Sequence, residues 1–305
     1  ATILQDKSKF RKFLSDNGFN CPKAKGYSSI DDALKDVDYF DWPVIVKPVD
    51  SAGSKGVSKV SGPKELPTAI DFAMSSSISK NFIIEDFLEK EGFSVGSESF
   101  VVDGKLVYNA FYDQMFDDES ANPYTPSAEV WPSVMSPKYQ DEIKSELQRL
   151  IDLLGITTGL FNVECRVCKN GKAYLMEVSP RAGGNRLAEM LNYAADVNII
   201  EAETRSSLGL NIMEIHEPTY KGNFAILVLH AKTDGYFMGI EIDQTFKDRH
   251  IIEEEIRAQS GEKVTMFSGA NAAIGTLFMR FESRELLNTY LMNQEDWLRV
   301  VISEC

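Results

Sequence analysis

Hydrophobic and polar residues alternate with a period of two on both sides of an Asn-Gly pair at residues 170–171. The apolar positions are Phe161, Val163, Cys165 and Val167 before the pair, and Tyr174, Met176 and Val178 after it. Alternation of this kind is typical of half-buried strands. Asn170 and Gly171 both tolerate a positive φ, which favours a two-residue type I′ turn. The pattern therefore predicts a β-hairpin.

The polar face of this hairpin brings two carboxylates together. In the register that a two-residue turn sets, the opposed pairs are Glu164–Glu177, Asn162–Ser179 and Arg166–Leu175. Directly opposed residues place their Cβ atoms about 4.5–5.5 Å apart, and like charges at that distance are destabilising. A magnesium ion between Glu164 and Glu177 would remove the repulsion, because Mg²⁺ prefers carboxylate oxygens and commonly shares its site with phosphates. The alternative is a solvated face on which Arg166 compensates the two charges.

The first ninety residues predict a small α/β unit. Residues 6–18 have the pattern of a helix with Asp6 as N-cap and Gly18 at its end. The following patterns predict a strand at 43–49, a glycine-rich loop at 50–57, a strand at 57–60, a helix at 62–74 and a strand at 82–88.

Longer strands follow at residues 93–102 and 105–115, and Asp103-Gly104 between them favours an antiparallel turn. Residues 117–137 are rich in Asp, Ser and Pro, and we expect a loop there. A helix is predicted over 136–155, with Ser136 as cap and Gly155 at its end. Beyond the hairpin, the chain predicts helix at 183–208, strands across 222–302 and a short helix at 283–292.

Composition narrows the class of protein. The chain has 305 residues, of which 43% are hydrophobic, enough for a substantial core. No apolar run reaches the ~18 residues of a membrane span, and the start "ATILQDKSKF" lacks a signal-peptide pattern, so we expect a cytoplasmic protein without a membrane partner. A net charge of -14 disfavours a nucleic-acid surface.

The spacing of Cys165 and Cys168 is that of a redox or zinc pair. Residues three apart on a strand point to opposite faces, so the predicted hairpin would separate the two thiols. Since the chain has no second CxxC motif, we disfavour both interpretations.

Lys47 stands near the end of an apolar strand, directly before the glycine-rich loop. Backbone amides at Gly53 and Gly56 can approach an anion closely, and further donors come from Ser51, Ser54 and Lys55. This arrangement suits a phosphate contact. The alternative is a surface turn beside a lysine that reaches solvent. The GxxxxGK[ST] pattern is absent, so the segment is not a Walker P-loop.

Two further segments carry candidate chemistry. Glu85 and exposed backbone groups at the end of the strand "FIIEDFL" could hydrogen-bond the edge of a purine, or the strand could simply emerge into solvent. Arg181 follows the hairpin, and its planar fork suits a phosphate or a carboxylate. The alternative for Arg181 is a salt bridge to a nearby glutamate.

The order of these motifs resembles the ATP-grasp superfamily. The segments are Asp6-Lys7, "VIVKP" with "SAGSKGV", "EDFLE", and "NVECRV" followed by "YLMEVSPRAGG". Within the superfamily, the chain looks most like the L-amino-acid ligases and the halves of the carbamoyl-phosphate synthetase large subunit. The tail "AAIGTLFMRFESRELL" is also similar to the L-amino-acid ligases.

The resemblance implies an α+β fold in which two lobes clasp ATP, with lobes at residues 1–90 and 91–215 and a strand-rich C-terminal lobe at 216–305. It also implies an ADP-forming ligase that phosphorylates a carboxylate, expected to belong to an amino acid or peptide, and lets an amine attack the acyl phosphate. The implied cofactors are ATP and Mg²⁺, with Mn²⁺ as an alternative ion. The implied partners are small-molecule carboxylates and amines, and a homodimer is left open.

The resemblance also assigns roles to residues. Lys7 and Lys47 would contact the phosphates. The glycine-rich loop would cover the nucleotide through Ser51, Gly53, Ser54, Gly56 and Val57. Adenine recognition falls to Glu85, Asp86, Phe87 and Leu88, and ribose binding to Glu91 or its neighbour Glu89. Metal binding falls to Glu164, Glu177 and Ser179. Arg181 would steady the transferred phosphoryl group or the acyl phosphate, and Arg186 would bind the substrate carboxylate.

Three departures from the family pattern keep alternatives open. Ser179 stands where the family usually has Asn, and Gly92 stands where a ribose-binding acid is expected. The N-terminal α/β domain that family members carry before this segment is absent from the sequence given, and we expect a fragment or a processed chain. The alternatives to a ligase are a nucleotide-binding protein without ligase activity and a metal-free structural domain.

Overall fold

The computed structural model describes residues 2–303, which form two compact units. Of the described residues, unit 1 comprises 2–94, 137–150 and 163–180, and unit 2 comprises 95–136, 151–162 and 181–303. Both contain helices and strands, as the sequence predicts for an α+β protein. Within the described part of the chain, every helix is too short or too polar to span a bilayer. The predicted three-lobe division remains a prediction.

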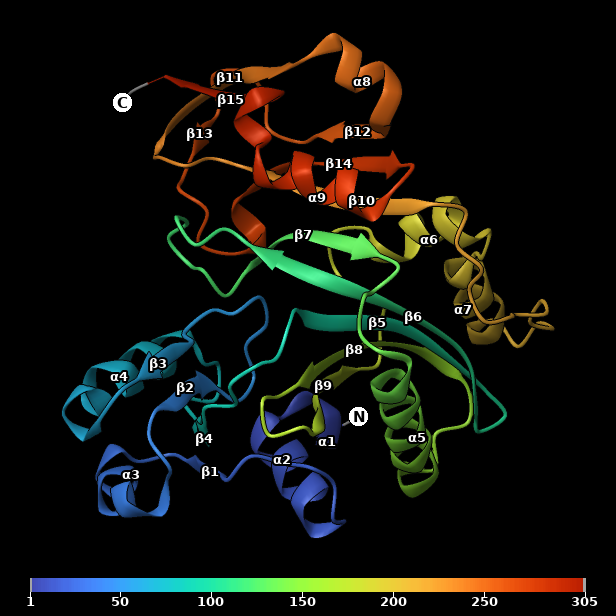
Figure 1. The fold of residues 1–305 in the computed structure, drawn as a ribbon. Coiled ribbons are helices and arrows are strands. Elements are labelled where there is room, and N and C mark those ends of the chain that lie inside the picture. Colours follow the sequence, from blue (N-terminus) through green and yellow to red (C-terminus); the bar gives the residue numbers. More distant parts are fainter. Residues whose placement is uncertain (1, 304–305) are drawn as a thin grey trace. The chain divides into compact units, whose positions relative to one another are not determined.

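Unit 1 contains a four-stranded antiparallel sheet of order β1-β4-β2-β3. Its strands are β1 (Ala24–Tyr27), β2 (Val44–Pro48), β3 (Ser58–Val60) and β4 (Phe82–Asp86). The helical segments of this part of the chain are α1 (Thr2–Gln5), α2 (Lys7–Asp16), α3 (Ile30–Lys35), η1 (Val37–Tyr39), η2 (Pro63–Glu65) and α4 (Leu66–Ser76). Figure 1 shows α3 and α4 beside these strands, and their apolar sides form the core with β2 and β4.

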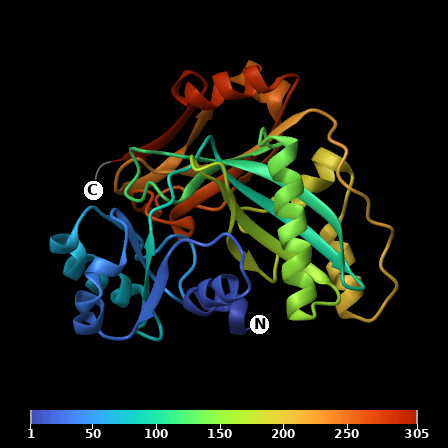
Figure 2. The ribbon, with the colours of Figure 1, turned by 60° about the horizontal axis from the view of Figure 1, so that its bottom comes forward.

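A second sheet has eight strands in the order β12-β14-β10-β7-β6-β5-β8-β9. The strands are β5 (Ser94–Val102), β6 (Lys105–Phe116), β7 (Pro126–Trp131), β8 (Gly159–Val167), β9 (Ala173–Ser179), β10 (Asn223–His230), β12 (Ile251–Ile256) and β14 (Ala273–Phe281). Asp103 and Gly104 both have a positive φ, of 47° and 77°, at the predicted turn between β5 and β6. The long helix α5 (Pro137–Leu154) has the predicted bounds and is the green helix of Figure 2.

Within unit 2, helices α6 (Leu187–Ala195) and α7 (Ile199–Ser207) lie side by side in both ribbon views and pack on one face of the sheet (Figures 1 and 2). The other face packs against α8 (Gln244–His250), α9 (Arg284–Met292) and a three-stranded sheet of order β13-β11-β15. The strands of this three-stranded sheet are β11 (Gly235–Ile242), β13 (Lys263–Val264) and β15 (Leu298–Ser303). Two short 3-10 helices are η3 (Ala270–Ala272) and η4 (Gln294–Asp296).

The structure corrects four details of the sequence prediction. The amide of Gly171 donates to Cys168 O (2.8 Å) and that of Cys168 to Lys172 O (3.0 Å), so the β8–β9 loop has three residues, not two. Gly171 has a positive φ of 72°, whereas Asn170 is not among the residues with positive φ. A type I turn closed by a left-handed glycine therefore replaces the predicted type I′ turn.

The other corrections concern elements. The predicted loop at 117–137 contains β7, because its backbone pairs with β6 on one side and β10 on the other. The predicted helix at 183–208 is two helices, interrupted at Asp196, which has a φ of 54°. The predicted strand region at 222–302 also contains α8, which Asp243 caps by accepting from the amide of Phe246 at 2.8 Å.

Candidate active site

Three charged side chains lie together in unit 1, of which Arg11 and Glu85 are buried and Lys47 is half-buried. The Glu85 carboxylate lies 2.9 Å from Arg11 Nε and 2.8 Å from Lys47 Nζ. Glu85 pairs across β4 and β2 with Ile45, two residues before Lys47, so Glu85 and Lys47 leave the same face of the sheet. Although burial acts to raise it, Arg11 and then Lys47 lower the pKa of Glu85 to about 2. Burial in turn lowers the pKa of Lys47, and Glu85 opposes that shift.

Lys7, the first residue of α2, connects two parts of unit 1. Asp6 caps this helix by accepting from the amides of Ser8 and Lys9, as predicted. The Lys7 amide donates to Val49 O at 3.0 Å, and its Nζ donates to Ser51 O at 2.8 Å. The same Nζ lies 3.3 Å from Glu177 Oε2. One ammonium therefore contacts both the start of the glycine-rich loop and a predicted metal ligand.

The glycine-rich loop, residues 51–57, has left-handed backbone at Gly53, Ser54 and Gly56, with φ of 67°, 56° and 72°. Its entry is fixed by Asp50, whose carboxylate accepts from Ser77 Oγ and from the amide of Ser79, both at 2.8 Å. Left-handed residues turn successive amides toward one side, which is how backbone forms an anion-binding concavity. The phosphate contacts of Ser51, Gly53, Ser54, Gly56 and Val57 remain predictions.

The two hairpin carboxylates are electrostatically coupled. The surrounding protein raises the pKa of Glu164, and the neighbouring Glu177 carboxylate raises it further. Burial acts to raise the pKa of Glu177 as well, but Lys7 and the Ser179 hydroxyl, which donates to Glu177 Oε1 at 3.0 Å, hold it below its usual value. The coupling that the sequence predicts for Glu164 and Glu177 is thus present, although the turn that led to it is different.

Glu164, Glu177 and Ser179 fit a magnesium ion that is shared with phosphates. Residues 2–303 contain no group of three or more His, Cys, Asp or Glu side chains that could hold a metal by themselves. Mg²⁺ is usually held by one or two carboxylates together with substrate phosphates, not by an all-protein cage. Two coupled carboxylates beside a hydroxyl match that donor set.

The segment predicted to bind adenine and ribose is largely engaged within the protein. Asp86 accepts from the amide of Asp41 at 2.9 Å, and the Phe87 amide donates to Pro43 O at 3.0 Å. Leu88 O accepts from Arg166 at 3.3 Å. The Glu85 carboxylate belongs to the buried triad, so the structure shows it orienting Lys47. Adenine contacts by residues 85–88, and ribose contacts by the exposed Glu91, remain predictions.

The two arginines predicted to act on substrate differ in their surroundings. Arg181 is exposed, and its Nη1 donates to Ala182 O at 2.6 Å. Arg186 has a φ of 63° and is surrounded by carboxylates. It pairs with Glu189, with Glu253 at 2.6 Å and with Glu255 at 3.4 Å. Its charge is therefore compensated inside unit 2, which favours an anchoring role over the predicted capture of a substrate carboxylate.

The sequence prediction missed several buried charged residues, among them Arg11, Glu98 and Glu129. Arg11 of α2 was not singled out, although it stands between the apolar Phe10 and Leu14. Glu98 is completely buried in β5, where Asn162 donates to it at 2.6 Å and the Gly183 amide at 3.1 Å. Glu129 is buried in β7, which was taken as loop. Alternating "SAEVW" between two prolines was the available signal for β7.

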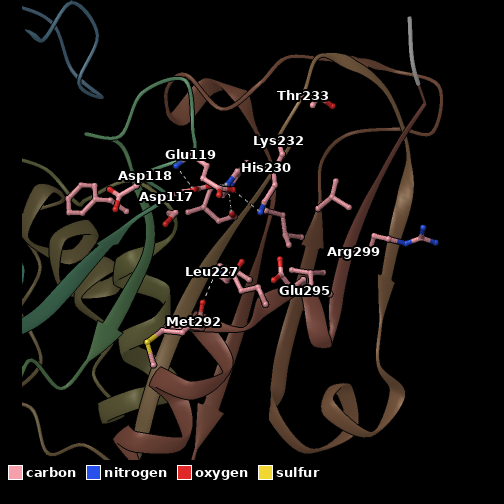
Figure 3. A pocket seen from close by; sticks show the side chains of 18 of the residues that line it. Asp117, Asp118, Glu119, Leu227, His230, Lys232, Thr233, Met292, Glu295 and Arg299 are labelled. Carbon is pink, nitrogen blue, oxygen red and sulfur yellow. Dashed lines mark hydrogen bonds and ion pairs between the residues drawn. The ribbon is translucent and has the colours of Figure 1, made fainter.

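A separate cavity of about 670 Å³ lies in unit 2 and is lined by none of the predicted site residues. Its apolar wall comes from β10, α9 and β15, including Leu227 and Met292, and the other residues labelled in Figure 3 form its polar rim. His230 and Asp117 point toward each other there, with Nε2 and Oδ2 3.0 Å apart. Lys232 and Arg299 at the rim are paired with Glu119 and Glu241.

Residues 40–189 match the model of the ATP-grasp domain. The chain contains an ATP-grasp domain. The matched range includes every residue predicted for the site except Lys7. The fold of the ATP-grasp domain and its resemblance to ligases, both predicted from the order of the motifs, are confirmed.

Among curated proteins, the ATP-grasp chain is similar to the carbamoyl phosphate synthase large chain of Thermotoga neapolitana, with 27% identity over 213 residues that cover 70% of this chain and 19% of the relative. The C-terminal section of the Aquifex aeolicus large chain is 24% identical over 211 residues, covering 69% of this chain and 38% of the relative. The chain thus spans 19% of the length of the first of these relatives.

Solved structures share the ATP-grasp fold. An L-amino acid ligase from Bacillus licheniformis matches with a TM-score of 0.84 and 18% identity, covering 99% of this chain and 74% of that one. The biotin carboxylase domain of Hydrogenobacter thermophilus 2-oxoglutarate carboxylase, in complex with MgADP and bicarbonate, matches with a TM-score of 0.73 and 15% identity over 99% of this chain and 67% of that one.

Proposed function

We propose that this protein is an ATP-dependent, ADP-forming ligase that joins a carboxylate to an amine through an acyl phosphate. The observation that carries the proposal is the position of Lys7, whose ammonium contacts Ser51 O in the glycine-rich loop at 2.8 Å and Glu177 at 3.3 Å. The single Lys7 ammonium thus contacts both the candidate phosphate-binding loop and a carboxylate that is a candidate magnesium ligand. Such a relation is expected where nucleotide phosphates and their metal ion share one site.

The candidate site residues of unit 1 can then be assigned roles that suit phosphoryl transfer. Lys47 is held in place by the buried Glu85 and presents its charge at the end of β2, where it would bind a phosphate oxygen. Lys7 would neutralise a second phosphate. Glu164 and Glu177 would hold Mg²⁺, which when bound supplies charge neutralisation for the phosphates. Phosphoryl transfer needs positioning and charge stabilisation more than covalent catalysis, and these groups provide both.

The comparisons support a carboxylate substrate. The similar proteins include an L-amino acid ligase, an N5-carboxyaminoimidazole ribonucleotide synthetase and carbamoyl phosphate synthase large chains. We expect an amino acid or a peptide to supply the carboxylate here. Arg181, exposed and close enough to influence the pKa of the Glu98 carboxyl, is the cation that we assign to the acyl phosphate.

A nucleotide-binding protein without ligase activity is the second candidate. It is favoured by Arg186, whose charge is already compensated by three glutamates and so offers little to a substrate carboxylate. In that case the protein would bind ATP with Mg²⁺ but release no ADP with any carboxylate and amine.

ADP release across a panel of amino acids, offered in pairs as carboxylate and amine donors with and without Mg²⁺, tests the proposal. We expect magnesium-dependent ADP release that requires both partners, and loss of that release in Lys7→Ala. Lys12→Ala on the same helix is the matched control, because Lys12 is exposed and pairs only with Asp16 among the described residues. Tight magnesium-dependent ATP binding with no ADP release from any pair would favour the second candidate.

A further inference from the structure

The loop that follows the hairpin, residues 181–186, is attached by three carboxyl groups to strands of unit 2. Glu98 in β5 accepts from the amide of Gly183 at 3.1 Å. Glu129 in β7 accepts from Asn185 Nδ2 at 2.9 Å. Glu253 in β12 pairs with Arg186 at 2.6 Å. Successive parts of one short loop therefore each have an acidic anchor.

Glu129 and the Arg186 contacts lie on the same face of the eight-stranded sheet. Across the ladder, Glu129 pairs with Ile226, and Ile226 pairs with Phe278. Paired residues of antiparallel strands point to the same side, so these three side chains share a face. The Arg186 guanidinium lies 4.6 Å above the Phe278 ring. The loop consequently covers the face on which Glu129 is buried.

The backbone of the loop needs these anchors. Asn185 and Arg186 are consecutive left-handed residues with φ of 52° and 63°, a conformation that L-residues other than glycine seldom adopt. The loop also approaches the sheet closely at Gly183, where an added Cβ would lie 2.7 Å from Glu98 Oε1 and 2.4 Å from Leu187. A strained and close-fitting loop persists only where its surroundings fix it.

Glu129 is an unfavourable residue for stability alone. Its exposed fraction is 2%, and among the described residues its Oε2 has no hydrogen-bond partner. Burial raises the pKa of Glu129 to about 8, although the Asn185 amide opposes the shift. A buried polar atom without a partner costs free energy that an apolar side chain of similar size would avoid. The carboxyl is therefore better explained by its one contact, with Asn185, than by its contribution to the core.

We propose that Glu129 is a positioning residue that acts through Asn185: it fixes the left-handed turn after Arg181 and so sets the direction in which the Arg181 guanidinium meets the acyl phosphate. This rests on the proposed ligase function. We assign Glu129 itself no contact with nucleotide or substrate. Its effect must appear in the rate of the reaction and not in nucleotide binding.

Kinetics of four variants test the proposal. Glu129→Leu and Asn185→Gly should each lower kcat by about 10²-fold, the usual effect of a small misplacement of a catalytic group, while KM for ATP stays within about twofold. Glu129→Gln should retain activity, because a glutamine oxygen can still accept from Asn185. Thr276→Val is the matched control: Thr276 is buried on the same face and its Oγ1 also lacks a partner among the described residues, but it has no bond to the loop.

The double variant Glu129→Leu/Asn185→Gly separates a shared mechanism from two independent defects. If Glu129 acts through Asn185, the double variant is no slower than either single variant. Multiplied losses, of about 10⁴-fold, would overturn the proposal. Equal losses in Glu129→Gln and Glu129→Leu would also overturn it, since the contact with Asn185 would then not be the feature that matters.

Hydrogen exchange at the amides of residues 181–187 tests the same idea without any turnover. We expect at least tenfold faster exchange in Glu129→Leu and in Asn185→Gly, with parental rates in Glu129→Gln, in Thr276→Val and in the β10 strand of every variant. Asn185→Gly keeps the test valid should Glu129→Leu fail to fold. If hydrogen exchange at residues 181–187 is unchanged in Asn185→Gly, the positioning role is refuted, even when the parent protein releases ADP normally. Faster exchange without ADP release from the parent would refute the ligase function alone.

Discussion

Removing the Glu85 carboxylate should leave the buried Arg11 and the half-buried Lys47 without compensation. Glu85 is 2% exposed, and it lies 2.9 Å from Arg11 and 2.8 Å from Lys47. Glu85→Gln keeps the shape of the side chain but removes its charge. Breaking a buried ion pair by deleting one partner typically costs about 3–5 kcal/mol. We therefore expect the free energy of unfolding of unit 1 to fall by about 3 kcal/mol or more at pH 7.

The pKa of Glu85 gives an independent value for this loss in the free energy of unfolding. It is about 2 in the folded protein, against an ordinary value of 4.5. At 1.36 kcal/mol for each unit, this difference corresponds to roughly 3 kcal/mol. Because the folded-state pKa is lowered, this stability is present above pH 4.5 and is lost as the pH falls toward 2. The parent should thus lose stability across that range, and Glu85→Gln should lose correspondingly less.

Urea unfolding, followed by hydrogen exchange at the amides of β2 and β4, measures the effect within unit 1. Asp16→Asn is the control, because the Lys12–Asp16 pair is exposed on α2 and such pairs are worth about 0–1 kcal/mol. If Glu85→Gln lowers the free energy of unfolding no more than Asp16→Asn does at pH 7, the triad does not hold Lys47 in place.

Three further variants test other parts of the site. Lys47→Ala should weaken binding of an ATP analogue by about 1.5–3 kcal/mol through loss of one charge-assisted contact, and calorimetric titration showing parental affinity in a folded variant would exclude the contact. Ser179→Asn should lower the magnesium concentration for half-maximal nucleotide binding and Glu177→Gln should raise it; unchanged midpoints in both would place the ion elsewhere. In the parent, stability should fall as the pH rises from 4.5 to about 8, because burial raises the pKa of the native Glu129 carboxyl and the unfolded chain releases its proton first. Glu129→Gln should remove this pH dependence, and thermal unfolding with the same pH dependence in both proteins would contradict the prediction.

The sequence predicted helix ends and turns correctly where neighbouring residues determine the backbone conformation. Ser136, Pro137 and Gly155 gave the bounds of α5, and Gly155 ends it with a φ of 62°. Asp6 was identified as the cap of α2 for the same reason. Asp103-Gly104 and Asn170-Gly171 carry nearly the same turn signal, yet only the first pair has a positive φ at both residues. The second turn is decided by its bonds between Cys168 and Lys172, which the dipeptide does not encode.

Long-range contacts explain the features that the sequence did not reveal. β7 is rich in neither branched nor aromatic residues at its start, and it becomes a strand because β6 and β10 flank it. Arg11 is buried because Glu85, 74 residues away, lies beside it. Arg186 was assigned to substrate on resemblance, whereas Glu253 and Glu255, more than 60 residues later in the chain, compensate its charge. No local pattern contains these partners.

Isotope transfer tests the acyl-phosphate mechanism most directly. A carboxylate substrate found in the amino-acid panel would be labelled with ¹⁸O in its carboxyl group, turned over with ATP, Mg²⁺ and the amine, and the phosphorus-containing products analysed by mass spectrometry. Attack of the carboxylate on the γ-phosphorus predicts ADP and inorganic phosphate that carries one labelled oxygen. Label in AMP, or unlabelled phosphate beside ADP, would contradict an acyl-phosphate intermediate.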